Sequence, residues 1–329
     1  MLTDRCISVV VVCYNDEGSI VELLRRLSVV MDKITPNWEV IYVNDDSPDN
    51  SEKLLLELAK SNQRLTVISH ARNFGAQTAF TTGMSQASGD SVVIMDGDLQ
   101  DPPELIEKFC EKWLEGYQVV FGIRAKRHEG WFRNFGYRLF YRIFQKISYL
   151  DIPLDAGEFS LMERVVIDVI LACPEHDRLI RGLRAYAGFK QVGIEFERPE
   201  RYSGQSTQGL FDYFMWAYKS FTSFSLVPLR LISLLAFATT IVTLGLLLYH
   251  ISNYFMGVAS PKGVMTIVIL ILSIGSITMF SLGVIGEYLG RLFIEIKNRP
   301  EPIIRTIVND HRSAPREWLG RKNSIHRKE

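Results

Sequence analysis

The first half of the chain alternates between short apolar runs and longer amphipathic segments. Five runs rich in β-branched residues predict buried strands at Ile7–Cys13, Trp38–Val43, Leu65–Ile68, Val92–Met95 and Val119–Phe121. Between these runs, apolar residues recur at helical spacing in four segments, around 19–32, 54–58, 74–87 and 105–114. Repeated strand–helix units of this kind predict an α/β fold, with a mostly parallel sheet covered by helices on both faces.

The second half contains two long apolar runs, at about 231–251 and 264–286, and neither run contains Asp, Glu, Lys or Arg. Each run is about 20 residues long, which is the length that a helix needs to cross the bilayer core. Buried helices of a soluble protein are the alternative, but two uncharged runs of this length in one chain favour membrane spans. We therefore expect two C-terminal transmembrane helices.

Aromatic and basic residues gather in two segments outside these runs. Residues 131–150 have the pattern of an amphipathic helix, which either packs on the sheet or lies in the membrane interface. A second aromatic segment directly precedes the first apolar run, and there we favour the interfacial interpretation. The expected organisation is a cytoplasmic domain (1–207), an interfacial segment (208–228), a pair of transmembrane helices (229–290) and a basic tail (291–329).

Charge is distributed unevenly around the apolar runs. Lys and Arg are frequent on their outer flanks, whereas the connecting loop 252–263 contains only Lys262. The positive-inside rule therefore predicts that the N-terminal domain and the tail are cytoplasmic. The totals of 37 Lys and Arg and 37 Asp and Glu cancel, so no overall field attracts nucleic acid. The four cysteines have no C-x-x-C spacing, which fits a reduced domain without zinc or disulfides.

The fourth predicted strand ends in the most informative motif of the chain. Its apolar run leads into Asp96-Gly97-Asp98, with Gln100 two residues later and a double proline behind it. In open α/β sheets, ligands bind at the carboxyl ends of the strands. Two carboxylates and an amide oxygen suit Mg²⁺ or Mn²⁺, which bind through one or two carboxylates together with substrate phosphates. The sequence thus predicts a metal site at Asp96, Asp98 and Gln100, and a reaction on a nucleotide diphosphate.

An ordered set of motifs adds a family resemblance. The motifs are Tyr14-Asn15-x-Glu17, Val43-x-Asp45-x-Ser47-Pro48-Asp49, Arg72-Asn-Phe-Gly75, Asp96-Gly-Asp-Leu-Gln-Asp-Pro-Pro103, Asp155-Ala-Gly157-x-Phe159, Arg181-Gly182, Arg201-x-x-Gly204-x-Ser206 and Pro228-Leu-Arg230. From Val10 to about Pro302, the chain resembles the polyprenyl-phosphate glycosyltransferases of glycosyltransferase family 2. These are enzymes of the dolichyl-phosphate mannose synthase and bactoprenol glucosyltransferase type. The resemblance implies a GT-A catalytic domain, which is Rossmann-like with a mostly parallel sheet.

The resemblance also implies residue roles. On the nucleoside side we expect Tyr14, Glu17 (or its neighbour Asp16), Val43 and Asp45, and Asp96 and Asp98 would act through the metal. Arginines suit phosphate groups, and the resemblance gives this task to Arg124, Arg133 and Arg201. Asp155 would orient the acceptor or take a residual proton, although a structural carboxylate is an open alternative. The expected catalytic residues are Asp98, Asp155 and Arg201.

The expected reaction transfers a hexose from a nucleotide sugar to a polyprenyl phosphate, either undecaprenyl or dolichyl phosphate. A phosphate monoester has a second pKa of about 6, so it is already a nucleophile at neutral pH. A single displacement would invert the anomeric centre. UDP-glucose is the favoured donor, ahead of GDP-mannose or a modified UDP-sugar. Four departures from the family pattern leave the identity of the sugar open: Val12-Cys13, Ala76-Gln77, Tyr137 and Ser160. The histidines have no ligand spacing and receive no role.

Three alternative functions compete with this interpretation. A processive polysaccharide synthase predicts a Q-x-x-R-W motif and more membrane helices, which the sequence lacks. A non-catalytic, membrane-anchored scaffold that binds a sugar lipid predicts the loss of the metal carboxylates, which are present. A dinucleotide oxidoreductase predicts G-x-G-x-x-G after the first strand, and the sequence has no such motif there. The expected location is the bacterial cytoplasmic membrane, and Gly283 and Gly286 would permit self-association into a homo-oligomer.

Overall fold

The computed structural model describes residues 1–124, 156–176, 178–197, 199, 227–256, 263–297 and 299–310. The chain forms two compact units, of which one is built around a sheet and the other contains two long helices. Three predicted site residues, Arg133, Asp155 and Arg201, lie outside the described residues, as does the predicted interfacial segment up to residue 226.

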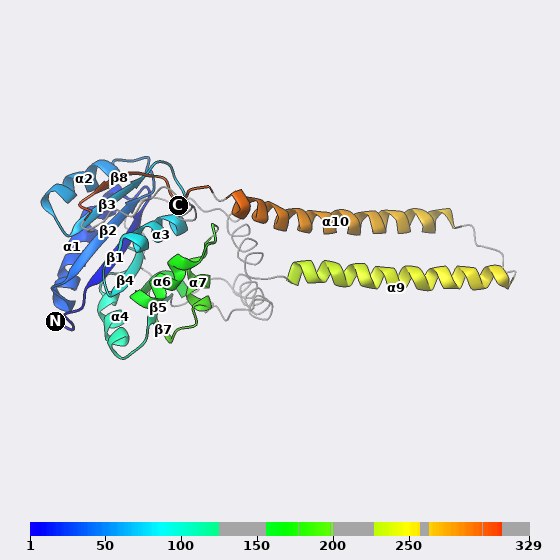
Figure 1. Cartoon of the computed structure of the whole chain (residues 1–329), viewed down its shortest axis with the longest axis horizontal. Coiled ribbons are helices and arrows are strands. Elements are labelled where there is room, and N and C mark those ends of the chain that lie inside the picture. The colour runs from blue at the N-terminus through cyan, green and yellow to red at the C-terminus, as the bar shows by residue number, and fades with distance from the viewer. Residues whose placement is uncertain are drawn as a thin grey trace, which may run out of the picture. The chain divides into compact units, whose positions relative to one another are not determined.

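The first unit is built on an eight-stranded mixed sheet with the strand order β7-β5-β6-β4-β1-β2-β3-β8 (Figure 1). The strands are β1 (Ile7–Cys13), β2 (Trp38–Asn44), β3 (Leu65–His70), β4 (Ser91–Asp96), β5 (Val119–Arg124), β6 (Ala156–Glu163), β7 (Gln191–Phe196) and β8 (Ile304–Val308). The pairs β1–β2, β1–β4, β2–β3 and β5–β7 are parallel. The pairs β4–β6, β5–β6 and β3–β8 are antiparallel.

Helices cover both faces of this sheet, as the alternating pattern predicted (Figure 1). Residues of α1 (Glu17–Ile34), α2 (Ser51–Ser61) and α4 (Leu105–Leu114) join the core on one face. Residues of α3 (Ala76–Gln86), α6 (Arg164–Ala172) and α7 (Ile180–Tyr186) join the core on the other. The central strands have almost no polar positions because both of their faces are buried. The mixed α/β sheet expected of a GT-A-like fold is therefore confirmed.

Three strands escaped the sequence analysis. β6 and β7 carry glycine and charged residues among their apolar positions, and β8 is only five residues long. A search for continuous apolar runs finds strands that are buried on both faces, and it misses strands with polar positions. β6 inserts antiparallel between β4 and β5, so the sheet contains more antiparallel pairing than repeated strand–helix units suggested.

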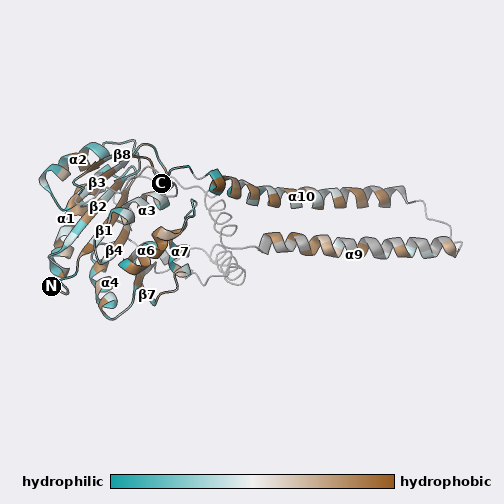
Figure 2. Cartoon of the chain, viewed as in Figure 1, coloured by the Kyte–Doolittle hydropathy of each residue, from teal (hydrophilic) through white to brown (hydrophobic). Residues whose placement is uncertain are grey.

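The second unit contains α9 (Val227–Phe255) and α10 (Val264–Lys297). In Figure 2 the coloured residues of these helices are mostly hydrophobic, and large apolar side chains such as Phe237 and Phe280 are exposed. By length and composition, one helix segment in the described part of the chain, Ile274–Lys297, is a candidate membrane span. Of the two spans that we expected, the structure thus offers a candidate within α10.

The structure also differs from the expected boundary of the tail at residue 291. α10 continues to Lys297, and β8 then pairs with β3 at the edge of the sheet. Asn309 holds the end of β8 against α2 and β3, because its side-chain amide donates hydrogen bonds to the carbonyl oxygens of Ala59 and Leu65 at 2.8 and 3.0 Å. Part of the segment expected as a basic tail is therefore a strand of the first unit.

Candidate active site

The carboxyl ends of β1, β2, β3 and β4 meet at one edge of the sheet, because these four strands are parallel neighbours. Three non-glycine residues with positive φ lie directly after these strands: Asn15 at 61°, Asp46 at 56° and Leu99 at 62°. Left-handed backbone is costly for a bulky residue such as leucine, and strain of this kind clusters at functional sites. The edge chosen from the sequence therefore carries independent marks of a site.

The Asp96-Gly97-Asp98 turn is held tightly against β1. The Gly97 N–H donates to the Val12 carbonyl oxygen at 2.9 Å, and the Ser19 hydroxyl donates to the Gly97 carbonyl oxygen at 2.6 Å. A Cβ atom at position 97 would lie 2.7 Å from the Val12 carbonyl oxygen, which is closer than such atoms approach. Glycine between the two aspartates is therefore a packing requirement.

The three predicted metal ligands belong to this turn and the residues after it. Asp98 is 4% exposed, and its Oδ1 accepts the Gln100 N–H at 3.0 Å. Asp96 ends β4, and its N–H donates to Asp101 Oδ2 at 3.2 Å. The Gln100 side-chain amide donates to the Pro199 carbonyl oxygen at 3.3 Å. Among the described residues, no three His, Cys, Asp or Glu side chains form a metal-binding cluster, so the metal site stays a prediction.

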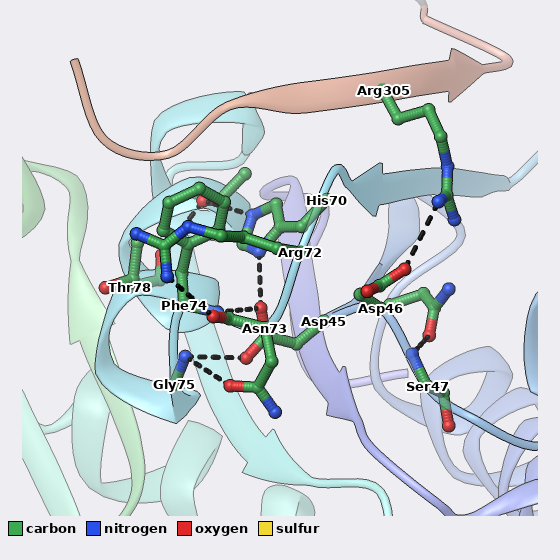
Figure 3. A network of polar contacts seen from close by, with 12 residues as sticks. Asp45, Asp46, Ser47, His70, Arg72, Asn73, Phe74, Gly75, Thr78 and Arg305 are labelled. Carbon is green, nitrogen blue, oxygen red and sulfur yellow. Dashed lines mark hydrogen bonds and ion pairs between the residues drawn. The ribbon is translucent and has the colours of Figure 1, made fainter.

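Asp45 lies at the centre of a buried polar network (Figure 3). Its Oδ1 accepts hydrogen bonds from His70 Nδ1 at 2.7 Å and the Phe74 N–H at 2.9 Å. Its Oδ2 accepts the Gly75 N–H at 2.7 Å. The other ring nitrogen of His70 lies 2.9 Å from the Thr82 hydroxyl. Because a carboxylate only accepts, His70 carries a proton on Nδ1. Asp45 thus joins the end of β2 to the Arg72–Gly75 loop.

The loops after β1 and β2 are joined in the same manner. The Asn15 N–H donates to the Ser47 hydroxyl at 2.6 Å, and the Glu17 N–H donates to Asp49 Oδ2 at 3.0 Å. Glu17 Oε2 accepts the Asn50 N–H at 3.3 Å. Partial burial raises the pKa of Asp49, but hydrogen bonds from Ser47, from Ser51 and from backbone N–H groups outweigh it and leave that pKa lowered.

Two other predicted nucleoside-side residues lie at the same edge. Tyr14 follows β1 and is 45% exposed, whereas Val43 near the end of β2 is fully buried. Asp16, the neighbour considered beside Glu17, is buried and its Oδ2 accepts the Tyr14 N–H at 3.2 Å. The structure therefore brings the predicted nucleoside-side residues together. We call the loops after β1, β2 and β3 (residues 14–17, 44–50 and 71–75) the β1–β3 rim.

β8 contributes to this rim from the far end of the chain (Figure 3). The Arg305 guanidinium contacts Asp46 Oδ1 at 3.2 Å and Glu52 Oε2 at 2.7 Å. Both carboxylates raise the pKa of Arg305, with the hydrogen bond to Glu52 as the largest cause. Two residues before Arg305, just ahead of β8, the Ile303 carbonyl oxygen accepts the Ala71 N–H at 2.9 Å. The rim is thus supported on its outer side by residues that the sequence analysis assigned to a tail.

A second group of polar residues lies at the end of β5, at the start of β6 and on α7, and we call it the β5–β6 rim. Arg124 ends β5, and a Cβ atom on Gly157 would lie 3.5 Å from Arg124 Nε. On α7, Arg184 is 1% exposed and donates to the Gly157 carbonyl oxygen at 3.4 Å. Glu158 accepts from the Gln77 side-chain amide at 3.1 Å.

Sequence reasoning missed four of these residues. His70, Glu158, Arg184 and Arg305 had no motif or spacing that tied them to the predicted site. His70 was set aside for lack of ligand spacing, which tests for metal binding and says nothing about a single carboxylate partner. Arg305 was counted among the basic residues of the tail. Of these four residues, only Glu158 could have been assigned to the site from the sequence, because it lies inside the Asp155–Phe159 motif.

Comparison with known proteins agrees with this arrangement. Residues 8–171 match the family described as glycosyl transferase family 2. An uncharacterized glycosyltransferase of Bacillus subtilis (strain 168) is 39% identical over 302 residues, which cover 91% of this chain and 93% of the relative. An uncharacterized glycosyltransferase of Synechocystis is 36% identical, with 89% and 93% covered. The bactoprenol glucosyl transferase of Shigella phage SfII is 32% identical, with 94% and 99% covered. The chain therefore belongs to glycosyltransferase family 2 and is a glycosyltransferase.

Proposed function

We propose that this protein transfers a hexose from a nucleotide sugar, with UDP-glucose as the first candidate, to a polyprenyl phosphate. The observation that carries the proposal is the Asp96-Gly97-Asp98 turn, packed against β1 beside the β1–β3 rim. The names of the bactoprenol glucosyl transferases, which match nearly the full chain, support the lipid acceptor and the glucosyl donor.

The β1–β3 rim would bind the nucleoside. Tyr14 offers an exposed aromatic ring, and Val43 and Glu17 would complete the wall of the pocket. A carboxylate has about four acceptor positions. Three protein groups already bind Asp45, so one position remains for an N–H group of a base or a hydroxyl of a ribose. Because the rim is already held by hydrogen bonds, little ordering would be needed when the nucleotide binds.

The donor set at the end of β4 fits a divalent cation. Asp96 and Asp98 are joined by a glycine that places the turn within hydrogen-bonding distance of β1, and Gln100 adds an amide oxygen. Mg²⁺ and Mn²⁺ prefer such oxygen ligands and are usually completed by substrate phosphates. When bound, the cation would neutralise charge on the departing nucleotide. Asp96, Asp98 and Gln100 would hold it, and Asp98 is the residue on which transfer depends most.

The acceptor phosphate would be held by arginines. Arg124 lies on the β5–β6 rim, and we propose Arg133 and Arg201 as further ligands for the acceptor or the diphosphate. The acceptor phosphate needs no strong base because it is largely ionised at neutral pH. Asp155 would therefore orient the acceptor or take a residual proton. A single displacement by the phosphate oxygen would invert the anomeric centre.

We propose that the chain crosses the membrane twice. β3 precedes α9 and β8 follows α10, and the two strands pair in one sheet. The chain must therefore leave and return on the same side of any membrane, which requires an even number of crossings. This supports α9 as a second span beside the candidate in α10, with the sheet and the tail in the cytoplasm. The lipid acceptor would then be undecaprenyl phosphate in a bacterial cytoplasmic membrane.

The test uses full-length protein in detergent with undecaprenyl phosphate, Mg²⁺ or Mn²⁺, and separate UDP- and GDP-sugars. We expect one donor to give a polyprenyl phosphate that carries a single hexose, detected by mass spectrometry. NMR of this product should show that the anomeric configuration is inverted relative to the donor. EDTA should abolish the product and added Mn²⁺ should restore it. A ladder of lengthening saccharides would instead indicate a processive synthase. Failure to bind any nucleotide sugar would indicate a non-catalytic scaffold.

A further inference from the structure

A half-buried glutamate and a buried arginine, Glu158 and Arg184, face the same region of the β5–β6 rim without bonding to each other. Glu158 Oε1 is held by Gln77, but Glu158 Oε2 is buried and has no hydrogen-bond partner in the described part of the chain. Arg184 bonds only to the Gly157 carbonyl oxygen through Nη2, and its Nε and Nη1 atoms have no partner among the described residues. Both residues therefore keep open hydrogen-bonding capacity.

This capacity is costly in the absence of a ligand. Burial lowers the pKa of Arg184 to about 10, and Glu158 opposes that shift, so the two charges interact and Arg184 is a cation at neutral pH. A buried polar group without a partner costs about 1–3 kcal/mol, and a charged group costs more. The Arg184 guanidinium also stacks over the Phe121 ring, 4.7 Å from the ring centroid, which fixes the guanidinium in place. Charges held open in this manner are typical of a binding site.

The open atoms belong to the end of the β4–β6 pair that carries the proposed metal turn. β4 and β6 are antiparallel with Ile94 opposite Ser160, and Asp96 lies two residues after Ile94 whereas Glu158 lies two residues before Ser160, so both residues lie toward the same end of the pair. Val92, Ile94 and Met162 belong to the core on one face of the sheet. By strand alternation, Asp96 and Glu158 are on that same face. α7 packs on this face through Ile180 and Leu183, which brings Arg184 to it.

The chemistry of the two open groups selects the ligand. A carboxylate only accepts hydrogen bonds and a guanidinium only donates them, so a group between them must do both. Hydroxyl groups do both, and a hexose carries several on neighbouring carbons. We propose that Glu158 and Arg184 together bind hydroxyl groups of the donor hexose and select which hexose is transferred. This inference rests on the proposed function, because the sugar would follow the diphosphate held at Asp96 and Asp98.

The test separates recognition of the sugar from recognition of the nucleotide. Wild-type, Glu158→Gln and Arg184→Met proteins, all full length in detergent with Mn²⁺, are titrated with UDP, UDP-glucose, UDP-galactose, GDP and GDP-mannose. We expect both variants to bind the nucleoside diphosphates as wild type does. Their affinity for the preferred nucleotide sugar should fall by about 10-fold to 100-fold, as expected for a lost hydrogen bond to a charged group. Discrimination between UDP-glucose and UDP-galactose should shrink in parallel.

Matched controls lie close by. Glu163→Gln changes a carboxylate at the other end of β6, and Arg178→Gln changes an arginine in the segment before α7. Both should bind every probe as wild type does. Glu158→Gln keeps the size of the side chain, so it carries the test if Arg184→Met lowers the yield of folded protein.

Three results would count against the proposal. If both variants bind and discriminate the nucleotide sugars as wild type does, the open atoms are satisfied by water and the inference fails alone. If the variants lose UDP and UDP-glucose binding equally, the pair supports the fold or the diphosphate, and the hexose assignment is overturned. If wild-type protein binds no nucleotide sugar, the proposed function fails and this inference fails with it.

Discussion

The two rims of the sheet edge differ in how their polar groups are satisfied. In the β1–β3 rim, Asp45 accepts three hydrogen bonds from the protein, and Asp46 and Asp49 are also bonded. In the β5–β6 rim, Glu158 and Arg184 keep buried atoms without partners among the described residues. Most polar groups of the first rim are thus bonded within the protein before a ligand arrives, although Asp45 keeps one acceptor position and Asn44 Nδ2 has no partner among the described residues. In the second rim, both charged groups need a ligand to complete their bonds. A rigid nucleoside pocket beside a selective sugar pocket would explain the difference.

The largest effect should come from the turn between the rims. Asp98→Ala removes a buried carboxylate that we propose to hold the metal, and it should lower kcat by about 100-fold to 1,000-fold, as losses of central electrostatic groups do. Nucleoside binding at the β1–β3 rim should survive. Asp90→Asn, which changes a carboxylate beyond the opposite end of β4, serves as the control in the same lipid product assay. Normal turnover by Asp98→Ala would contradict the proposed metal site.

Asp45→Ala should test whether the first rim is structural. It would leave His70 and the Phe74 and Gly75 N–H groups without their shared acceptor. A buried donor left without its acceptor costs about 1–3 kcal/mol, and three donors share Asp45, so the Tm in detergent should fall by several degrees. Glu158→Gln should lower the Tm much less, since the amide can keep the Gln77 contact and Glu158 Oε2 has no hydrogen-bond partner to lose among the described residues, so that only the attraction to Arg184 is removed. Equal losses of Tm in the two variants would remove the contrast between the rims.

A smaller effect is expected from Gly97→Ala. Its Cβ would lie 2.7 Å from the Val12 carbonyl oxygen, so the turn must move away from β1. Overpacking costs about 1–3 kcal/mol. A displacement of catalytic groups by about 1 Å can lower kcat by about 100-fold. Gly157→Ala is the control for stability, because its Cβ meets the Arg124 side chain at an ordinary 3.5 Å. If the Tm falls more for position 157 than for position 97, the turn is not packed as described.

The smallest effect concerns the support that β8 gives to the first rim. Arg305→Ala removes contacts to Asp46 and Glu52, but all three side chains are partly exposed and such pairs contribute little to stability. We expect the donor KM to rise by a few-fold because the Asp46 turn loses support, with kcat and the acceptor KM unchanged. Arg305→Lys should restore part of the donor KM. A change confined to the acceptor KM would show that β8 does not act through this rim.

The sequence predicted the central sheet well because burial on both faces leaves a continuous apolar run. Ile7–Cys13 has the same bounds in the pattern and in the structure, and the strand before Asp96 differs by one residue at each end. β6 and β8 were missed because their polar positions and short length resemble loops. The strand order could not follow from the pattern, since β6 enters between two strands that precede it in the chain.

Those residues of the candidate site that belong to a sequence motif were predictable. Asp96 ends a strand, Asp98 and Asp45 follow strands, and parallel strands bring their carboxyl ends together. The partners of these residues were not predictable, because His70 and Arg305 reach the rim through pairing of distant segments. Arg184 is a further case, since an arginine on a short helix gives no sign in the sequence that it will be buried with two of its nitrogen atoms lacking partners among the described residues.

The pairing of β8 with β3 also sets the order in which the protein can be made. β3 is synthesised early, but its edge partner follows both long helices, and the Thr66 hydroxyl bonds to the Asn309 carbonyl across 243 positions. Until that segment emerges from the ribosome, β3 is an open edge that can pair with other chains. The first unit can therefore be completed only after the helices have been synthesised. A nascent chain that stalls before β8 would expose this edge, which gives cellular quality control a means to distinguish it from the finished protein.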